Sequence, residues 1–218
     1  MTPSGWFRRS VARWVRALAV LGVVWLAAAV PAQAASFGEL VVLRGQAVVT
    51  RGESSVLVRD HAPVDEGDRV DSLADSKVQI LIGGKESGME ALLAARTSIV
   101  VGRLEQDRSL GSPISLAFGV LRTRVRAWSG QPFVSTRAAI IGIKGTDFVV
   151  WVKRPQAAEF VGVEGLIECV SRSNKDFSIR IGKRQWGEIV ENEKPKAPIA
   201  VPDDIWRQVE TDYAFPAP

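Results

Sequence analysis

Short runs in which apolar and polar residues alternate recur along this chain, and they restrict the fold more than any other feature. In an extended strand, neighbouring side chains point to opposite faces, so alternation indicates a strand with one buried face. Lys77–Ile82 shows the pattern clearly and ends where two glycines interrupt it. We predict strands at Leu40–Leu43, Gln46–Arg51, Val56–Arg59, from Val70, and at Lys77–Ile82, Thr97–Val101, Ile114–Ala127, Pro132–Thr136, Asp147–Lys153, Glu159–Val163, Gly165–Ser171, Phe177–Ile181 and Glu188–Glu191.

Helical patterns are few, and the sequence offers two candidates. Gly88–Arg96 is rich in Ala, Leu, Met and Glu, which favour helix, and a strand with a bulge is the competing prediction. Pro202–Tyr213 carries apolar residues at helical spacing, and Asp203 or Asp204 can cap its start. The predicted fold is therefore all-β, either a two-sheet sandwich or a β-roll/solenoid-like domain, with a short C-terminal helix.

A glycine stands directly before three of the alternating strands, at Gly45, Gly119 and Gly165. Glycine at such a position permits a bulge or a tight corner. Similar units that stack on one another suit a β-roll or a solenoid-like sandwich. The alternative is that three matches of this length arise by chance among many strands.

The first 34 residues have the parts of a secretory signal peptide. Four arginines and no acidic residue precede an apolar run, Ala17–Val30, and a small-x-small cleavage site ends at Ala34. We expect export to the periplasm and cleavage after Ala34. The alternative is an uncleaved anchor, but the run is about 14 residues, against the roughly 20 that a spanning helix needs.

Cleavage changes the charge balance of the chain. The precursor has 28 Lys and Arg against 24 Asp and Glu, and loss of the four leader arginines makes the two numbers equal. A near-neutral domain lacks the basic surplus of a nucleic-acid-binding protein, so we expect no nucleic-acid partner. We also expect no membrane span after cleavage, and the sequence does not set the oligomeric state.

Few residues in this chain have the chemistry of a catalytic or metal centre. Cys169 is the only cysteine and lies in an apolar run, which indicates a buried, inert thiol. His61 is the only histidine, which disfavours a zinc site and a serine–histidine–acid triad. Asp65, Glu66 and Asp68 form an acidic turn, for which solvation is the simple interpretation and weak calcium binding the alternative. We therefore expect no enzyme activity, no metal and no cofactor.

Three arginines, Arg122, Arg124 and Arg126, fall on one face of the strand predicted at 114–127, and Trp128 continues that face. One interpretation is a solvated outer face, paired with acidic residues of neighbouring strands. The other is a binding site for a carboxylate-rich partner, a phosphate or an anionic glycan, since guanidinium groups and an indole ring suit such ligands.

Short motifs follow one another in a fixed order between residues 64 and 170. They are Val64–Val70 with its Gly-Asp turn, Asp75–Ile80, Gly119–Arg122, Gly142–Phe148 (Gly-Ile-Lys-Gly-Thr-Asp-Phe) and Val163–Gly165. In this order, behind a signal peptide, they resemble the FecR-like periplasmic domain known from iron-responsive transmembrane regulators of bacteria. The resemblance implies a non-catalytic periplasmic module for protein binding, sensing or signalling. The alternative function is an envelope module that binds glycan or peptidoglycan.

Two departures from the family pattern matter. Residues 82–88 and the Ala/Leu-rich stretch after them replace the short Asp-Gly-Ser hairpin that the family has at this place. Only about 16 residues precede the apolar run, too few for a cytoplasmic anti-sigma segment, so we expect a free-standing exported module. The expected organisation is a signal peptide at 1–34, a FecR-like domain at 35–192, and a linker with the short helix at 193–218.

The glycine motif also has a physical interpretation that is independent of the family. Gly142 and Gly145 permit unusual backbone angles, and Thr146 and Asp147 can bind backbone donors in a turn. The strand that begins at Phe148 is apolar on both faces, which is typical of an internal strand. We therefore interpret the motif as a determinant of the fold and not as a ligand site.

Overall fold

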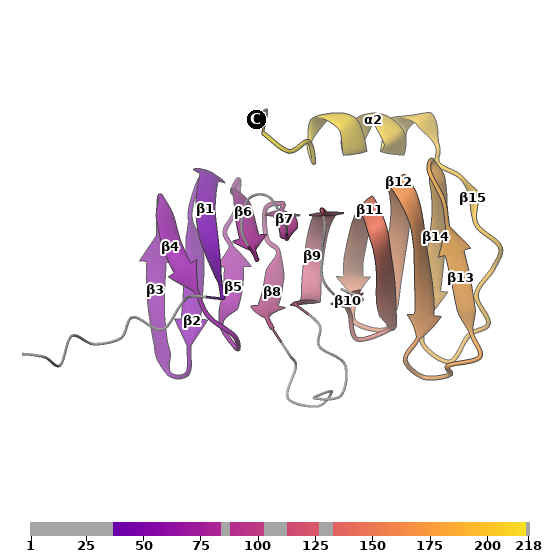
Figure 1. Ribbon diagram of the computed structural model, residues 1–218, viewed down its shortest axis with the longest axis horizontal. Helices are drawn as coiled ribbons and strands as arrows, with labels where there is room; N and C mark the ends of the chain where they lie inside the picture. Colours follow the sequence, from indigo (N-terminus) through magenta and orange to yellow (C-terminus); the bar gives the residue numbers. More distant parts are fainter. Residues whose placement is uncertain (1–36, 84–87, 103–112, 127–132, 217–218) are drawn as a thin grey trace, which may run out of the picture. The chain divides into compact units, whose positions relative to one another are not determined.

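The computed structural model describes residues 37–83, 88–102, 113–126 and 133–216 (Figure 1). Within these ranges the chain is almost entirely β-structure, with one short helix, α2 (Asp203–Thr211), near its end. The strands are β1 (Gly38–Arg44), β2 (Ala47–Arg51), β3 (Ser54–Val58), β4 (His61–Val64), β5 (Arg69–Ser72), β6 (Lys77–Ile82), β7 (Met89–Leu93), β8 (Ser98–Val101), β9 (Ile114–Val125), β10 (Phe133–Ser135), β11 (Ala139–Arg154), β12 (Ala157–Ser171), β13 (Ser178–Ile181), β14 (Gln185–Val190) and β15 (Ile199–Ala200). The predicted all-β fold with a short C-terminal helix is confirmed.

The strand pairings divide the sheet into two layers. Layer 1 has the order β4-β1-β6-β7-β9-β11-β12-β14-β15. Layer 2 has the order β3-β2-β5-β8-β9-β10-β11-β12-β13. Three long strands, β9, β11 and β12, contribute one half to each layer, so the layers form one continuous sheet.

The side chains between the two layers form one hydrophobic core. Ile80 and Phe148 come from layer 1, Val70 and Ile99 come from layer 2, and all four are completely buried. Because each strand directs alternate side chains into this core, the core follows directly from the two-residue period of the sequence. Burial of these apolar side chains is the main favourable contribution to folding.

The chain passes between the layers at glycines with a positive φ. Gly119 lies in the middle of β9 with φ +102°, and a Cβ there would lie 2.6 Å from the Cα of Thr97. No other residue fits both the backbone angle and this close approach. Gly45 and Gly165 also have a positive φ, and they mark the corners between β1 and β2 and within β12. The three glycines of the sequence pattern are thus three corners of the fold.

Some local predictions were wrong. Gly88–Arg96 does not form a helix and contains a strand, as the competing prediction had it, because β7 lies between β6 and β9 and its backbone hydrogen bonds go to both neighbours. The sequence did not predict β4 (His61–Val64), a short edge strand whose one partner among the described strands is β1. β11 begins at Ala139, eight residues before the predicted start, because it continues through the glycine motif into layer 2.

Helix α2 lies across β11, β12 and β14 (Figure 1) and buries Trp206 and Val209. Its N-cap is Pro202, and no side chain caps it, so the predicted aspartate cap is wrong. Asp203 and Asp204 lie instead in the first turn, where negative charge interacts favourably with the helix dipole. In the part of the chain that the structure describes, no helix has the length and apolar character needed to cross a membrane.

Candidate binding face on layer 1

The arginine row (Arg122, Arg124 and Arg126) lies on the outer side of β9 and of the residue directly after it, and β9 lies between β7 and β11 in layer 1. The alternate residues of this strand, Leu121 and Thr123, are completely buried on the inner side. The row and the core residues therefore separate onto two faces, as the two-residue period predicts.

Asp147 holds two arginines of this row. Arg122 donates from Nε to Oδ1 and from Nη2 to Oδ2, each at 2.8 Å, which is bidentate geometry. Arg124 donates from Nη2 to Oδ2 at 3.2 Å. The side chains of Arg122 and Asp147 are only 9% and 5% exposed, so the pair lies away from water and each charge depends on the other.

Glu90 on β7 binds Arg126, the remaining member of the row, and also lies near Arg124. Its carboxylate lies 3.0 Å from Nη2 of Arg126 and 3.9 Å from Nη1 of Arg124. The cluster thus contains three positive charges and two carboxylates, Asp147 and Glu90. One positive charge remains, and it attracts further acceptors, which are supplied by backbone carbonyl groups of the C-terminal segment.

The C-terminal segment covers Arg122 with the carbonyl end of α2. Nη1 of Arg122 donates to the carbonyl oxygens of Val209 and Tyr213, at 3.3 and 3.1 Å. Nζ of Lys77 on β6 donates to the carbonyl of Ala214 at 2.7 Å. A helix ends with unpaired carbonyls and a partial negative charge, and α2 has no basic residue in its last turn. The sheet supplies the cations that α2 lacks.

An aromatic ring after α2 completes the cover over the arginine row. The Phe215 ring lies 4.4 Å from the guanidinium carbon of Arg124 and 5.3 Å from that of Arg122. These distances are typical of cation–π interactions. The segment from Val209 to Phe215 therefore contacts Arg122 with both its carbonyl groups and a ring.

An apolar cluster lies beside the arginines, between α2 and layer 1. The Trp151 and Tyr213 rings pack edge to face, with centroids 5.8 Å apart and planes at 75°. Trp206 and Val209 of α2 pack into the same cluster, which also contains Val149, Val161 and Trp186 of the sheet. We call the outer side chains Val120, Arg122, Val149, Trp151, Val161 and Trp186 the α2-binding face.

The expectation of a solvated arginine face is therefore wrong for Arg122. Its guanidinium is buried beneath a segment that follows almost 90 residues later, and no local pattern in the sequence indicates that cover. Arg124 and Arg126 keep 35% and 49% of their side chains exposed, and both are paired with carboxylates. Trp128 lies outside the described residues.

The glycine motif lies inside β11 and not in a turn. The pairing of β11 with β12 shifts register between Lys144 and Asp147, and Gly145, with φ +57°, stands in this bulge. Here β11 passes from layer 2 to layer 1, so that Asp147 points to the outer face and Phe148 into the core. Gly142 has an ordinary φ, and Thr146 is buried and makes no side-chain hydrogen bond with any described residue.

The other candidate groups have structural roles or are isolated. Cys169 is completely buried, and burial raises the pKa of its thiol well above the ordinary value. Asp68 is also buried and accepts two hydrogen bonds from Arg51, at 2.8 and 2.6 Å. His61 is exposed and lies 3.3 Å from Asp60. Among the described residues, no cluster of His, Cys, Asp or Glu could hold a metal ion.

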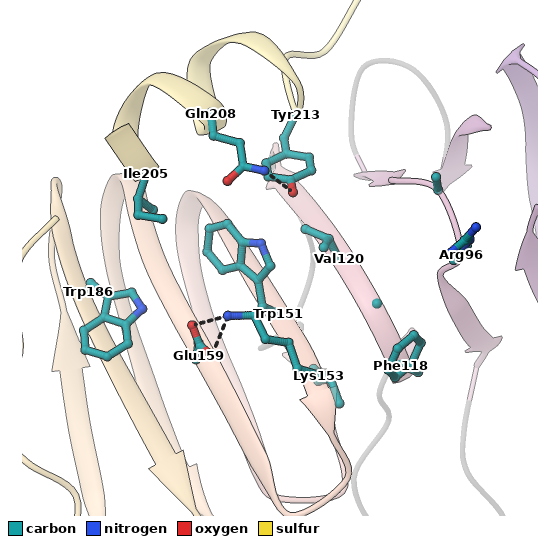
Figure 2. A pocket seen from close by; sticks show the side chains of 13 residues that line it. Arg96, Phe118, Val120, Trp151, Lys153, Glu159, Trp186, Ile205, Gln208 and Tyr213 are labelled. Atoms are coloured by element: carbon teal, nitrogen blue, oxygen red, sulfur yellow. Dashed lines mark hydrogen bonds and ion pairs between the residues drawn. The ribbon is translucent and has the colours of Figure 1, made fainter. Parts of the chain in front are cut away.

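A pocket of about 390 Å³ opens at the edge of the α2-binding face, and no motif in the sequence predicts it. Figure 2 shows Trp151 at its centre, with Trp186 on one side and Val120 and Phe118 on the other. The sheet residues form one wall of the pocket. Side chains of α2 and of the residues after it, including Ile205 and Tyr213, form the other wall. These residues are far apart in the sequence, so only the fold brings them together.

Comparison with known proteins identifies similar folds. No family model and no curated protein matches this chain. A crystal structure of a "putative anti-sigma factor" from Parabacteroides distasonis ATCC 8503 matches with a TM-score of 0.51 and 12% identity, over 66% of this chain and 64% of that one. A second such structure from this organism matches with a TM-score of 0.49 and 14% identity, over 64% of each chain. This chain therefore spans under two thirds of these chains' length, and at such identity the likeness concerns the fold alone.

Proposed function

We propose that this chain is an exported FecR-like module that binds a protein of the cell envelope and takes part in sensing or signalling, without catalytic activity. The predicted signal peptide and the order of the motifs from Val64 to Gly165 support it. The shared fold is consistent with a regulatory role, since the similar structure carries the name anti-sigma factor. The periplasm is the expected compartment.

The observation that carries this proposal is the way in which layer 1 holds a helix. Arg122 and Lys77 bind three backbone carbonyls at and after the end of α2, and an apolar strip contacts the helix side chains. Backbone carbonyls are present at the end of every helix, so this recognition depends little on sequence. A face of this kind is suited to binding protein segments.

The two buried aspartates, Asp147 of the arginine cluster and Asp68 of the turn before β5, support a binding role over a catalytic one. A general acid or base must be able to exchange a proton with a substrate within hydrogen-bond reach. Asp147 and Asp68 are instead buried, and each accepts a bidentate hydrogen-bond pair from an arginine. Both carboxylates therefore stabilise the fold through their arginine partners.

Crosslinking in the native envelope tests the proposal. A photoreactive amino acid would replace Arg207, which is exposed on α2, or Val56, which is 61% exposed on the edge strand β3. Arg180, 72% exposed on β13, would serve as the control position. We expect one of the first two positions to capture a defined inner- or outer-membrane protein that the control does not capture.

Failure to capture any envelope protein above background at either position would contradict the proposal. A parallel sedimentation experiment with purified cell-wall sacculi distinguishes glycan binding, the alternative function, from protein binding. Replacement of Arg124 and Arg126 by alanine would release the chain from sacculi only if the exposed part of the arginine row binds glycan. We expect little sedimentation of either form.

A further inference from the structure

The residues that line the pocket beside α2 are suited to binding a planar apolar group. Four aromatic residues, Phe118, Trp151, Trp186 and Tyr213, line it together with Val120 and Ile205 (Figure 2). Flat rings give a planar ligand a large contact area and favourable edge-to-face or stacked geometry. A volume of about 390 Å³ lies within the range of small-molecule sites.

The rim of this pocket carries a surplus of positive charge. Lys153 and Glu159 line the pocket and neutralise each other, with Nζ 2.9 Å from Oε1. Arg96 also lines it and is exposed, and its guanidinium has no ion pair in the part of the chain that the structure describes. A ligand with one negative charge would therefore find a complementary group beside the apolar walls.

We propose that this pocket binds a small ligand that has a planar apolar body and one anionic group. The rings of Trp151, Trp186 and Tyr213 hold the apolar body, and Arg96 pairs with the anion. This site is distinct from the arginine row, whose charges are paired with Asp147 and Glu90. It adds a small-molecule ligand to the protein-binding role proposed above and does not depend on the identity of any envelope partner.

The position of the pocket connects the ligand to helix α2. One wall belongs to layer 1, whereas Ile205, Gln208 and Tyr213 form the wall on the α2 side. A ligand that contacts both walls binds the docked state of α2 and not the released state, so binding stabilises docking by mass action. Occupancy of the pocket would thereby control how often α2 leaves the α2-binding face.

Calorimetric titration of the exported form, residues 35–218, with 8-anilinonaphthalene-1-sulfonate tests the site. This probe joins a planar apolar body to one sulfonate, and the neutral N-phenyl-1-naphthylamine is its uncharged match. We expect one probe molecule per chain, and we expect the anion to bind about two- to fivefold more tightly than the neutral compound, as for one exposed ion pair. Equal affinity of the two compounds would contradict the role of Arg96.

Substitutions locate the binding on the chain. Arg96→Gln should lower the affinity for the anion to that for the neutral compound. Arg154→Gln, a control on exposed Arg154 of β11, should change the affinity for neither compound. Val120→Trp should fill the pocket and lower the affinity for both compounds by at least about tenfold. Should Val120→Trp not fold, Phe118→Ala removes a half-exposed wall residue, with Leu166→Ala as the control of similar exposure.

Hydrogen exchange measures the link to the helix. The probe should slow amide exchange in α2 (Asp203–Thr211), and this protection should be lost in Arg96→Gln at the same probe concentration. Binding of several probe molecules per chain that neither Val120→Trp nor Phe118→Ala reduces would overturn the proposal. So would tight binding that leaves the exchange of α2 unchanged.

Discussion

Two arginine–aspartate pairs in this fold have the same bidentate geometry and different surroundings. In Arg122–Asp147 both side chains are buried, at 9% and 5% exposure. In Arg51–Asp68 the aspartate is 1% exposed, but the arginine is 55% exposed and also lies 2.8 Å from Asp65. The first pair is covered by the C-terminal segment, and the second faces solvent on its arginine side.

The difference shows what each aspartate contributes. Asp68 also accepts the backbone N–H of Asp65 at 2.8 Å, so it stabilises its own turn. Asp147 orients Arg122, whose third nitrogen then reaches the carbonyls of Val209 and Tyr213. One pair stabilises a local turn, and the other connects helix α2 to the sheet.

The largest expected effect is that of Asp147→Ala. This substitution leaves the Arg122 guanidinium buried without its carboxylate, and a broken buried pair costs about 3–5 kcal/mol. Urea unfolding should show a fall of this size in the free energy of unfolding. A loss below about 1 kcal/mol, as for an exposed pair, would contradict the assignment of Asp147 as the central acceptor.

Asp68→Ala should have a smaller effect. The Arg51 guanidinium can turn to water and keep its contact with Asp65, so the loss is that of a buried acceptor, about 1–3 kcal/mol. The same urea titration measures it. A loss equal to or greater than that of Asp147→Ala would remove the distinction between the two pairs.

The Asp68 pair should also produce a dependence of stability on pH. Burial alone would raise the pKa of Asp68, but the hydrogen bonds from Arg51 and from the Asp65 amide, with the charge of Arg51, outweigh it and lower the pKa below the ordinary value of 3.8. This contribution is present above the unfolded-state pKa and is lost as the pH falls through the lower, folded-state pKa. Acid titration of stability should therefore show a loss below about pH 4, and Asp68→Asn should remove that part.

The smallest expected effect is that of Phe215→Ala. It removes a partly exposed ring from Arg122 and Arg124, and cation–π contacts at such sites contribute about 0.5–1 kcal/mol. The change should appear as faster amide exchange in α2, with little effect on global unfolding. A global loss above about 2 kcal/mol would mean that the ring has a core role.

The sequence predicted the strands whose burial follows a simple period. β6 has the bounds predicted from its alternation, and β11 is buried on both faces from Phe148 to Val152, as its apolar run indicates. Gly88–Arg96 was ambiguous because alanine and leucine favour helix, yet the stretch lies between two strands that satisfy its backbone. β4 contains Pro63 and lies at an edge, so it lacks the residues typical of a strand.

The candidate site could be predicted only in part. The period of β9 placed the arginine row on one face, and the apolar spacing of Pro202–Tyr213 predicted a helix. Neither pattern indicates that Arg122 and Tyr213 meet, because their contact is set by the tertiary fold across 91 residues. The pocket around Trp151 has the same origin, since its two walls come from the sheet and from the chain's end.

The most direct test of the connection between α2 and the sheet is hydrogen exchange of residues 203–213 in Arg122→Met and in Arg51→Met. We expect Arg122→Met to speed the exchange of α2 by at least about tenfold, because the helix loses the donor to its terminal carbonyls. Arg51→Met should leave it unchanged. Equal exchange of α2 in both variants and in the unchanged protein would contradict the account, since α2 would then be held without Arg122.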